Sequence, residues 1–417
     1  MREMKDSGIP WIGEIPKGWS NAKYRYSGVF VKGKLPNEQN VEHIGKPIIG
    51  ASEMLGKECR NFSTDENVPT CQRENVLILW DGANAGIVAN NCEGIVSSTA
   101  VKYVCTDEKF DTQYLFYLFK NGEPFFKSKV NGTTIPHMNQ KYIDEYLCIQ
   151  PPFAEQQRIA EFLDRKCAEV DEMIGLQEQI IEELKAYKQS VITEAVTKGL
   201  NPAATMRDSG IEWIGQIPEH WEVKRIKFIG KAENGLTYTP NDVCDESEGT
   251  LVLRSSNIQD GKLAFNDNVY VRSVPDSLKV QVGDIIICSR NGSASLVGKS
   301  ALVEEDIDAS FGAFMMRFRS SSNSKYIHFL LTATISHYKQ LFTTTTINQL
   351  TIGLINNIAM PFICNATEQQ TIADYLDGKC ADIDSLIQTK LSKIDSLKEY
   401  KKSIIYEYVT GKQEVEL

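Results

Sequence analysis

Two stretches of the chain, residues 155–197 and 368–410, carry apolar residues at alternating steps of three and four. This spacing is typical of a long helix whose narrow apolar seam packs against another helix. The first stretch contains no proline and would run ~65 Å as one helix. The predicted seam residues are Leu163, Val170, Ile174, Ile181 and Leu184 in the first stretch, and Leu376, Ile383, Ile387, Ile394 and Leu397 in the second.

Polar residues interrupt both seams at equivalent places, Gln177 and Lys188 in the first and Lys390 and Lys401 in the second. Polar seam residues fix the register and the partner of a helix at some cost in stability. The obvious partner for each helix is the other one. The alternative is that each helix packs on its own globular domain.

Chain connectivity favours an antiparallel pair, because a parallel pair would need a ~65 Å return within the second globular part. This predicts a pseudo-two-fold dumbbell with both chain termini at one end. We expect Gly199 and Pro202 to stop the first helix, and Thr367 with Gln370 to form a capping box at the start of the second.

The segments before these helices have the pattern of mixed α/β domains. The apolar runs 76–80 and 285–288 predict buried strands, and each leads into a turn rich in Gly and Asn. Residues 111–121 and 324–342 have helical spacing. A Thr-rich loop follows in each half, at 132–136 and at 343–348.

The chain is a tandem duplication. Residues 4–19 and 206–221 are identical at 11 of 16 positions, and about half of residues 155–197 recur in 368–410. We therefore predict target-binding modules at 1–150 and 206–366, a central helical region at 151–205 and a C-terminal one at 367–417. Shared framework with different loops fits two modules that bind different ligands, and drift in a structural repeat would look similar.

Composition narrows the class of protein. The 417 residues are 42% hydrophobic and 24% charged, as in globular proteins, and the net charge is -10. The N-terminus has no apolar core of a signal peptide, and no apolar run approaches the ~20 residues of a membrane span. The ten cysteines form no CxxC pair, which favours reduced thiols in a cytosolic protein.

Catalytic motifs are not recognisable. Gly292 and Gly298 in the stretch before Lys299-Ser300 have the wrong spacing for a phosphate-binding P-loop. The sequence Gln-Pro-Pro-Phe at 150–153 has Gln where an amino-methyltransferase tetrapeptide has Asp, Asn or Ser, and we find no methyl-donor loop. The five histidines have no metal-ligand spacing, and His328 is best explained as a packed helix residue. The pattern favours a binding protein with no metal.

The chain resembles the specificity (S) subunits of type I restriction–modification systems. The resemblance covers nearly the whole chain. It rests on the repeated Ile-Gly-x-Ile-Pro-x-x-Trp openers, the Thr-Thr-Ile loops, the Glu-Gln-Gln helix entries and the two-fold repeat. It departs at 360–367, where Met-Pro-Phe and a longer linker replace Pro-Pro-Phe-Ala, which puts the local hinge in doubt.

The resemblance implies a cytoplasmic, non-catalytic prokaryotic protein with two target-recognition domains, each of which reads half of a bipartite site on double-stranded DNA. It further implies that the helices dock two methyltransferase (M) subunits that bind S-adenosylmethionine and methylate adenine. Nuclease (R) subunits that use ATP and magnesium would add cleavage. The chain itself would hold no cofactor.

DNA contacts are expected in two kinds of place. Lys23 with Arg25, and Arg225 with Lys227, alternate with apolar residues, so a strand would put each basic pair on one face toward phosphates. Asn and Arg read base edges in the major groove. The predicted exposed-loop contacts are Asn84, Thr133, Thr134 and His137 in the first module, and Asn257, Arg290, Asn291, Thr345 and Asn348 in the second.

Two other functions stay open from the residues alone: a coiled-coil adaptor without DNA reading, and a self-contained DNA-modifying enzyme. The distribution of charge along the chain bears on whether it binds DNA. Residues 151–205 carry six basic and ten acidic side chains, and 367–417 carry seven and ten, so the modules together are only -3. The acidic net charge therefore does not exclude DNA, but it predicts that the chain binds DNA with help from partner subunits.

Overall fold

The computed structural model describes residues 2–9, 12–23, 26–130, 136–139, 141, 143, 147–339 and 348–415. The chain forms two compact units. Unit 1 combines Met1–Glu178 with Leu391–Leu417, and unit 2 is Gln179–Lys390. Each unit therefore contains one globular module and a part of each long helix.

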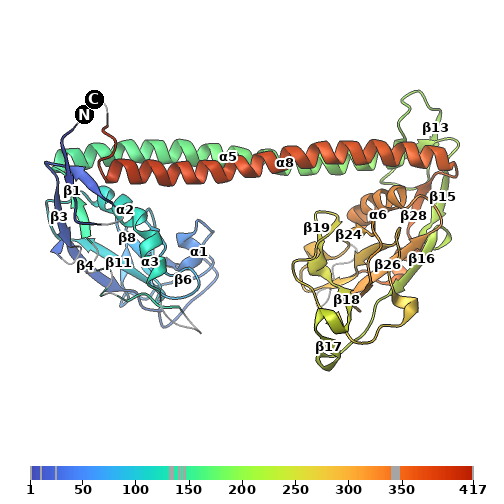
Figure 1. Cartoon of the computed structure of the whole chain (residues 1–417), viewed down its shortest axis with the longest axis horizontal. Helices are drawn as coiled ribbons and strands as arrows, with labels where there is room; N and C mark the ends of the chain where they lie inside the picture. The colour runs from blue at the N-terminus through green and yellow to red at the C-terminus, as the bar shows by residue number, and fades with distance from the viewer. Residues whose placement is uncertain are drawn as a thin grey trace. The chain divides into compact units, whose positions relative to one another are not determined.

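The module of unit 1 is built on two four-stranded sheets (Figure 1). One has the order β4-β11-β8-β9 and the other β6-β5-β10-β7. The strands are β1 (Met4–Asp6), β2 (Glu14–Pro16), β3 (Ser20–Lys23), β4 (Gly28–Lys32), β5 (Lys46–Ile49), β6 (Phe62–Ser63), β7 (Thr70–Cys71), β8 (Val76–Leu79), β9 (Val88–Ala89), β10 (Gly94–Val96), β11 (Ala100–Cys105) and β12 (Leu147–Gln150).

The predicted strand at 76–80 is confirmed as β8, and all four of its residues are buried. Val76 and Ile78 belong to one hydrophobic core and Leu77 and Leu79 to another, so both faces of this strand are covered, which explains its continuous apolar run. The predicted helix at 111–121 is α2 (Thr112–Asn121), capped by the carboxylate of Asp111. Two shorter helices of the module are α1 (Ala51–Met54) and α3 (Glu123–Ser128).

The module of unit 2 repeats this plan with the sheets β16-β26-β22-β24 and β17-β21-β18-β25. Its strands are β13 (Met206–Asp208), β14 (Gln216–Pro218), β15 (Glu222–Arg225), β16 (Gly230–Asn234), β17 (Val243–Cys244), β18 (Thr250–Leu253), β19 (Ile258–Gln259), β20 (Lys262–Leu263), β21 (Tyr270–Val271), β22 (Ile285–Cys288), β23 (Arg290–Asn291), β24 (Ser300–Leu302), β25 (Ala309–Phe311), β26 (Met315–Ser320), β27 (Asn348–Gln349) and β28 (Ala359–Phe362). The fully buried β22 is the predicted strand at 285–288.

The module of unit 2 also contains α-helices and 3-10 turns. The predicted helix at 324–342 is α6 (Ser324–Tyr338), and α7 (Ile352–Asn357) precedes β28. Single 3-10 turns lie at Ile226–Phe228, Pro240–Asp242, Glu246–Glu248, Ser255–Asn257, Asp276–Leu278 and Ala294–Leu296. The mixed α/β class predicted for both modules is confirmed.

The two long helices are α5 (Phe153–Lys198) and α8 (Ala366–Val409). Gly199, with φ +76°, ends α5 as expected, because a residue at positive φ cannot continue the helix. The capping box predicted at Thr367 and Gln370 is wrong. The side chain of Asn365 accepts from the amides of Thr367 and Glu368, so the helix begins two residues earlier than that box requires.

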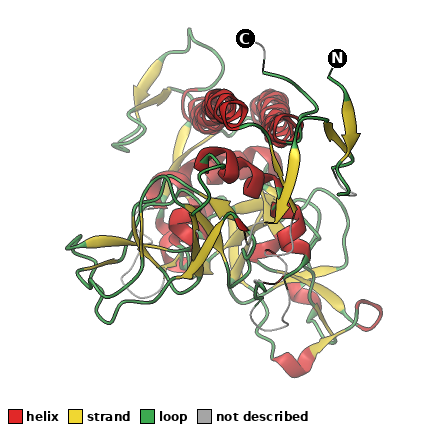
Figure 2. Cartoon of the chain, turned by 90° about the vertical axis from the view of Figure 1, so that its left-hand side faces the viewer, coloured by secondary structure: helices red, strands yellow, loops and turns green. Residues whose placement is uncertain are grey.

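The helices lie side by side and antiparallel within each unit (Figures 1 and 2). In unit 1 the Lys401 ammonium binds the Asp171 carboxylate at 2.6 Å, and the ring of Phe162 lies 4.3 Å from that of Tyr408. In unit 2 Lys188 binds Asp384 at 2.7 Å. As the residue number increases along α5, the number of its partner on α8 decreases, which confirms the antiparallel arrangement.

The predicted apolar residues of the seam are buried or half-buried. Leu163, Val170, Ile181, Leu376, Ile383, Ile387 and Ile394 are buried, and Ile174, Leu184 and Leu397 are half-buried. The two ion pairs are equivalent through the repeat, because Asp171 corresponds to Asp384 and Lys188 to Lys401. Two of the polar interruptions, Lys188 and Lys401, therefore bind acids of the opposite helix, and these ion pairs form in only one register.

The repeated Glu-Gln-Gln entry attaches each helix to its own module. Gln156 is fully buried, accepts from the amide of Asp111 at 2.9 Å and donates to the carbonyl of Pro151 at 2.8 Å. The preceding Glu155 accepts from the indole of Trp19 at 3.1 Å. Gln369 makes the same bonds to Asn323 and Ile363 in unit 2. The motif is thus a connection between helix and module.

Both chain ends lie in unit 1, where Arg2 binds Glu414 at 2.7 Å. Among the described residues, the helices are all too short or too polar to cross a membrane.

Candidate nucleic-acid interface

In unit 1 the turn after β8 and the end of the Thr-rich loop are joined. Asp81 and His137 form an isolated antiparallel bridge. The amide of Gly82 donates to the carbonyl of Pro136, and the amide of Met138 donates to that of Trp80, both at 2.9 Å. Two segments more than 50 residues apart thus share one rim of the module.

Side chains of this rim form a linked polar group. The Asp81 carboxylate receives the Lys32 ammonium and Nδ1 of His137, each at 2.7 Å. Burial opposes ionisation of Asp81, but these two hydrogen bonds outweigh it and lower the pKa of the carboxyl. The Lys32 ammonium also lies 5.7 Å from the centre of the Trp80 ring. Asn84 is exposed on the adjoining turn.

In unit 2 the corresponding turn and loop are joined by a pair of short strands, where unit 1 has a single bridge. β23, which follows β22, pairs with β27 so that Arg290 faces Gln349 and Asn291 faces Asn348. The amide of Leu350 donates to the carbonyl of Ser289 at 2.8 Å. The backbone frame therefore matches unit 1, while the side chains that it presents are different.

Arg290 is the best oriented base-reading candidate at this junction. One guanidinium nitrogen, Nη2, donates to Oε1 of Gln349 at 2.7 Å. The guanidinium carbon lies 5.7 Å from the centre of the Phe314 ring, which is 60% exposed. These contacts limit the rotamers of the arginine and leave further N–H groups for an acceptor such as O6 and N7 of guanine.

A cavity of about 780 Å³ opens beside Arg290. Its walls include Arg254, Lys299 and Asn291 together with the exposed Phe314 and a single acid, Asp267. Arg254 binds Asp267 at 2.9 Å, and the Asn291 amide donates to Ser255 at 3.2 Å. Three cations against one carboxylate make this hollow suitable for an anionic ligand such as a phosphate backbone.

The predicted phosphate-binding strands are only partly observed. Arg225 ends β15, but Lys227 lies in the following 3-10 turn, so the prediction of one alternating strand is wrong there. Both side chains are nevertheless exposed. Lys23 is half-buried at the end of β3, and Arg25 lies outside the described residues.

The remaining predicted DNA contacts differ in where the structure places them. Thr133, Thr134 and Thr345 also fall outside the described residues. Asn348 is half-buried in β27 and donates to the carbonyl of Gly292 at 3.2 Å. The prediction that Asn257 lies exposed in a loop is wrong. It is fully buried, its Oδ1 accepts from the amide of Arg254, and its Nδ2 donates to Ala264 at 3.0 Å.

Several residues of the two rims were not predicted, namely Lys32, Trp80, Asp81, Arg254, Lys299, Phe314 and Gln349. Asp81 and Gln349 each adjoin a predicted segment, so a wider reading of those loops would have included them. Lys32 lies on β4 and Phe314 in the turn before β26, and no local signal in the sequence marks either residue.

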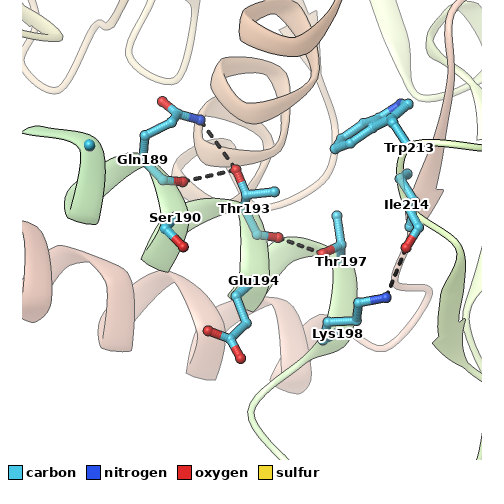
Figure 3. A pocket seen from close by; sticks show the side chains of 9 residues that line it. Gln189, Ser190, Thr193, Glu194, Thr197, Lys198, Trp213 and Ile214 are labelled. Atoms are coloured by element: carbon cyan, nitrogen blue, oxygen red, sulfur yellow. Dashed lines mark hydrogen bonds between the residues drawn. The ribbon is translucent and has the colours of Figure 1, made fainter.

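A second hollow, of about 580 Å³, lies in unit 2 between the end of α5 and the opener (Figure 3). Lys198 crosses it to donate to the carbonyl of Ile214 at 2.8 Å, and Thr193 bonds back onto its own helix. These bonds connect the helix end to the opener. Across the described part of the chain, His, Cys, Asp and Glu form no group of three or more that could hold a metal ion.

Comparison with known proteins assigns the family. A model of the type I restriction modification DNA specificity domain matches residues 16–186 and 218–396. The MjaVIII specificity subunit of Methanocaldococcus jannaschii is 28% identical, over 95% of this chain and 93% of the relative. The StySPI specificity subunit of Salmonella potsdam is 31% identical over 47% of this chain and 44% of the relative.

A solved chain from a study of type I R-M complex assembly has the same fold. It aligns with a TM-score of 0.69 at 15% identity and covers 96% of this chain and 99% of its own length. Since the two matched stretches make up most of the sequence and contain one module each, the chain belongs to the type I restriction modification DNA specificity domain family and carries that domain twice.

Proposed function

We propose that this chain is the DNA sequence-specificity subunit of a type I restriction–modification complex, in which each module reads one half of a bipartite site. The observation that carries the proposal is the repeated junction of turn and loop. An amide of the loop donates to the carbonyl just after the buried strand in both units, but one junction presents Lys32, Asp81 and His137 and the other Arg290 and Gln349. Similar junctions that carry different polar side chains suit two different half-sites.

The proposed DNA contacts are the predicted residues other than the buried Asn257, with the neighbours that the structure adds. In unit 1 they are Lys23, Arg25, Lys32, Asn84, Thr133, Thr134 and His137, and in unit 2 they are Arg225, Lys227, Arg254, Arg290, Asn291, Thr345, Asn348 and Gln349. Basic residues beside the openers would contact phosphates, and residues of the junctions would contact base edges.

In this proposal the chain itself catalyses no reaction. Two M subunits would bind S-adenosylmethionine and methylate adenine, and R subunits with ATP and magnesium would add cleavage, all in the cytoplasm of a prokaryote. The relatives give no support to a DNA-independent adaptor or to a self-contained modifying enzyme, since those reported are named as specificity subunits.

The test is co-expression with the cognate M subunit in a host free of DNA methylation, followed by genome-wide mapping of methyladenine. We expect a two-part motif with a fixed gap. The seam length of ~65 Å corresponds to ~19 base pairs, so half-sites about one helical turn apart would fit if the modules lean inward. Absence of any motif would refute the proposal.

A further inference from the structure

The three cations that line the hollow beside Arg290 can be compared with unit 1 position by position, because the two modules share backbone hydrogen bonds. The amide of Arg290 donates to the carbonyl of Phe314 at 3.1 Å, and the amide of Asp81 donates to that of Thr99 at 3.2 Å. The turn after β22 thus aligns with the turn after β8. Arg290 corresponds to Asp81, and Phe314 corresponds to Thr99.

Lys299 aligns in the same way. The amide of Cys288, the last residue of β22, donates to the carbonyl of Lys299 at 2.8 Å. The amide of Leu79, the last residue of β8, donates to the carbonyl of Ile87, also at 2.8 Å. Lys299 of unit 2 therefore corresponds to Ile87 of unit 1.

Arg254 directly follows β18, just as Gly50 directly follows β5. The amide of Arg254 donates to the side chain of Asn257 at 2.9 Å, and the amide of Gly50 donates to that of Glu53 at 2.9 Å. Each of the two strands also has a parallel neighbour, β25 for β18 and β10 for β5. Arg254 therefore corresponds to Gly50.

These replacements reverse the local charge. At the positions of the three cations, unit 1 has Gly50, Asp81 and Ile87. Unit 1 thus has one acid where unit 2 has three cations. The rim of unit 1 also contains Lys32, but its ammonium binds the Asp81 carboxylate at 2.7 Å. The cations that attract phosphates are therefore present in unit 2 and replaced at the equivalent positions of unit 1.

Two of the cations can accept an anion as a partner. Arg254 binds Asp267 at 2.9 Å, but this carboxylate is 66% exposed. Ion pairs with exposed acids contribute little to stability, so a phosphate can replace this partner. The Nε atom of Arg254 is buried and has no hydrogen-bond partner among the described residues. Lys299 donates to the carbonyl of Ile258 at 2.8 Å, which leaves two N–H groups of its ammonium.

The three cations suit two different tasks. Arg290 is oriented by Gln349 and suits a base edge. Arg254 and Lys299 line the same hollow, so on bound DNA they would lie beside that base pair and suit the phosphates of its strand. Phosphate contacts add affinity for any sequence, whereas base contacts select one sequence.

We propose that Arg254 and Lys299 form a phosphate clamp on one DNA strand, and that unit 2 therefore holds its half-site more tightly than unit 1 holds the other. This inference rests on the function proposed above, which supplies DNA as the ligand. Unit 2 anchors the complex on DNA, and unit 1 contributes mainly to the choice of sequence.

The test uses the complex with M subunits and two duplexes of the mapped motif, each with one half scrambled. Fluorescence anisotropy at several salt concentrations gives the affinity and its salt dependence. We expect the parent complex to bind one duplex about tenfold more tightly than the other at about 0.1 M salt. Arg254→Gln and Lys299→Gln should each lower the salt slope on that duplex by about one and leave the other duplex unaffected.

Arg272→Gln is the matched control. Arg272 is an exposed arginine of the same unit that lies 3.7 Å from the exposed Glu248, and it does not line the hollow. Its replacement should change neither the affinity nor the salt slope. The double variant Arg254→Gln with Lys299→Gln should keep the parental methylation motif, because neither residue selects a base.

Equal affinity of the parent complex for the two duplexes, including no measurable binding to either, overturns the inference. So does a double variant with the parental salt slope, or one that loses its M subunits, which would identify the hollow as a protein interface. In each of these cases a two-part methylation motif from the parent leaves the proposed function standing. A parent that produces no motif overturns both.

Discussion

Arg290 is held by its neighbours before any ligand arrives. The Gln349 amide accepts from one nitrogen, and the Phe314 ring lies under the guanidinium. A long side chain that is already ordered loses less conformational entropy on binding than a free one. His137 in unit 1 is similarly held by Asp81. These two residues are therefore the strongest single candidates for reading the two half-sites.

We predict that Arg290→Ala relaxes or abolishes recognition of one half-site only. Loss of a bidentate contact to guanine reduces discrimination at that base pair by ~1–3 kcal/mol. Methyladenine mapping should show a degenerate position in one half of the motif and an unchanged other half. His137→Ala is the matched variant and should alter the opposite half. Equal loss of both halves with Arg290→Ala contradicts the assignment.

His328 on α6 connects pH to the stability of unit 2. It is half-buried beside Ser300 at 3.1 Å, and burial lowers the pKa of its imidazole from 6.5 to about 4. The unfolded chain therefore takes up a proton near pH 6.5, whereas the folded chain does so only near pH 4. Folding stability should accordingly fall as the pH decreases from about 6.5 to about 4.

The His328→Gln variant should lose this part of the acid sensitivity, which amounts to at most ~1.4 kcal/mol per pH unit. Urea unfolding of parent and variant at pH 7 and pH 5 gives the comparison, and the difference at pH 7 measures the cost of the substitution itself. Identical dependence on pH in both proteins would show that the imidazole does not titrate as described.

Among the elements, the helix entries explain why the Glu-Gln-Gln motif occurs twice. The glutamate accepts from the opener's tryptophan, at 3.1 Å in unit 1 and 3.0 Å in unit 2. The buried glutamine joins the start of a module helix to the strand-helix junction. Three segments distant in sequence therefore meet at one polar cluster, and the start of each long helix is oriented on its module.

We predict that Gln156→Ala destabilises unit 1 and Gln369→Ala destabilises unit 2, each by ~1–3 kcal/mol, because buried backbone groups lose their partners. Gln157→Ala, one residue along in the same motif and exposed, is the control and should change stability by less than ~0.5 kcal/mol. Chemical unfolding of the full chain gives the values. Equal effects of Gln156→Ala and Gln157→Ala would contradict the role assigned to the buried residue.

For the chain as a whole, charge sets how it meets DNA. The net charge is -10, most of it on the long helices, and the modules have no large basic excess. Duplex affinity grows with the number of phosphates that Lys and Arg neutralise. The chain is thus better suited to select a sequence than to supply most of the binding free energy.

We therefore predict that the isolated chain binds a duplex with its mapped site only weakly, and that specific binding becomes measurable in the complex with M subunits. Fluorescence anisotropy with matched and scrambled duplexes, at one stated salt concentration, makes the comparison. Tight, specific binding by the chain alone would contradict this prediction.

The secondary-structure elements and the pairing of the two long helices could be predicted from the order of apolar and polar residues, because apolar periodicity and repetition can be read along the sequence. The strands β8 and β22, the helices α2 and α6, the antiparallel seam and the end of α5 at Gly199 were all predicted in this way. The start of α8 was not, since Asn365 and Thr367 are both good capping residues and only the backbone path selects between them.

The candidate site depended far more on folding. Asn257 and Asn291 lie in similar polar stretches, yet one is buried within a turn and the other lines the cavity. Lys32 and Gln349 reach the rims from strands, and Phe314 from a turn, that are distant in sequence. The apolar pattern determines which segments form strands and helices, but which polar side chains converge depends on contacts between distant segments, and these exist only once the sheets have formed.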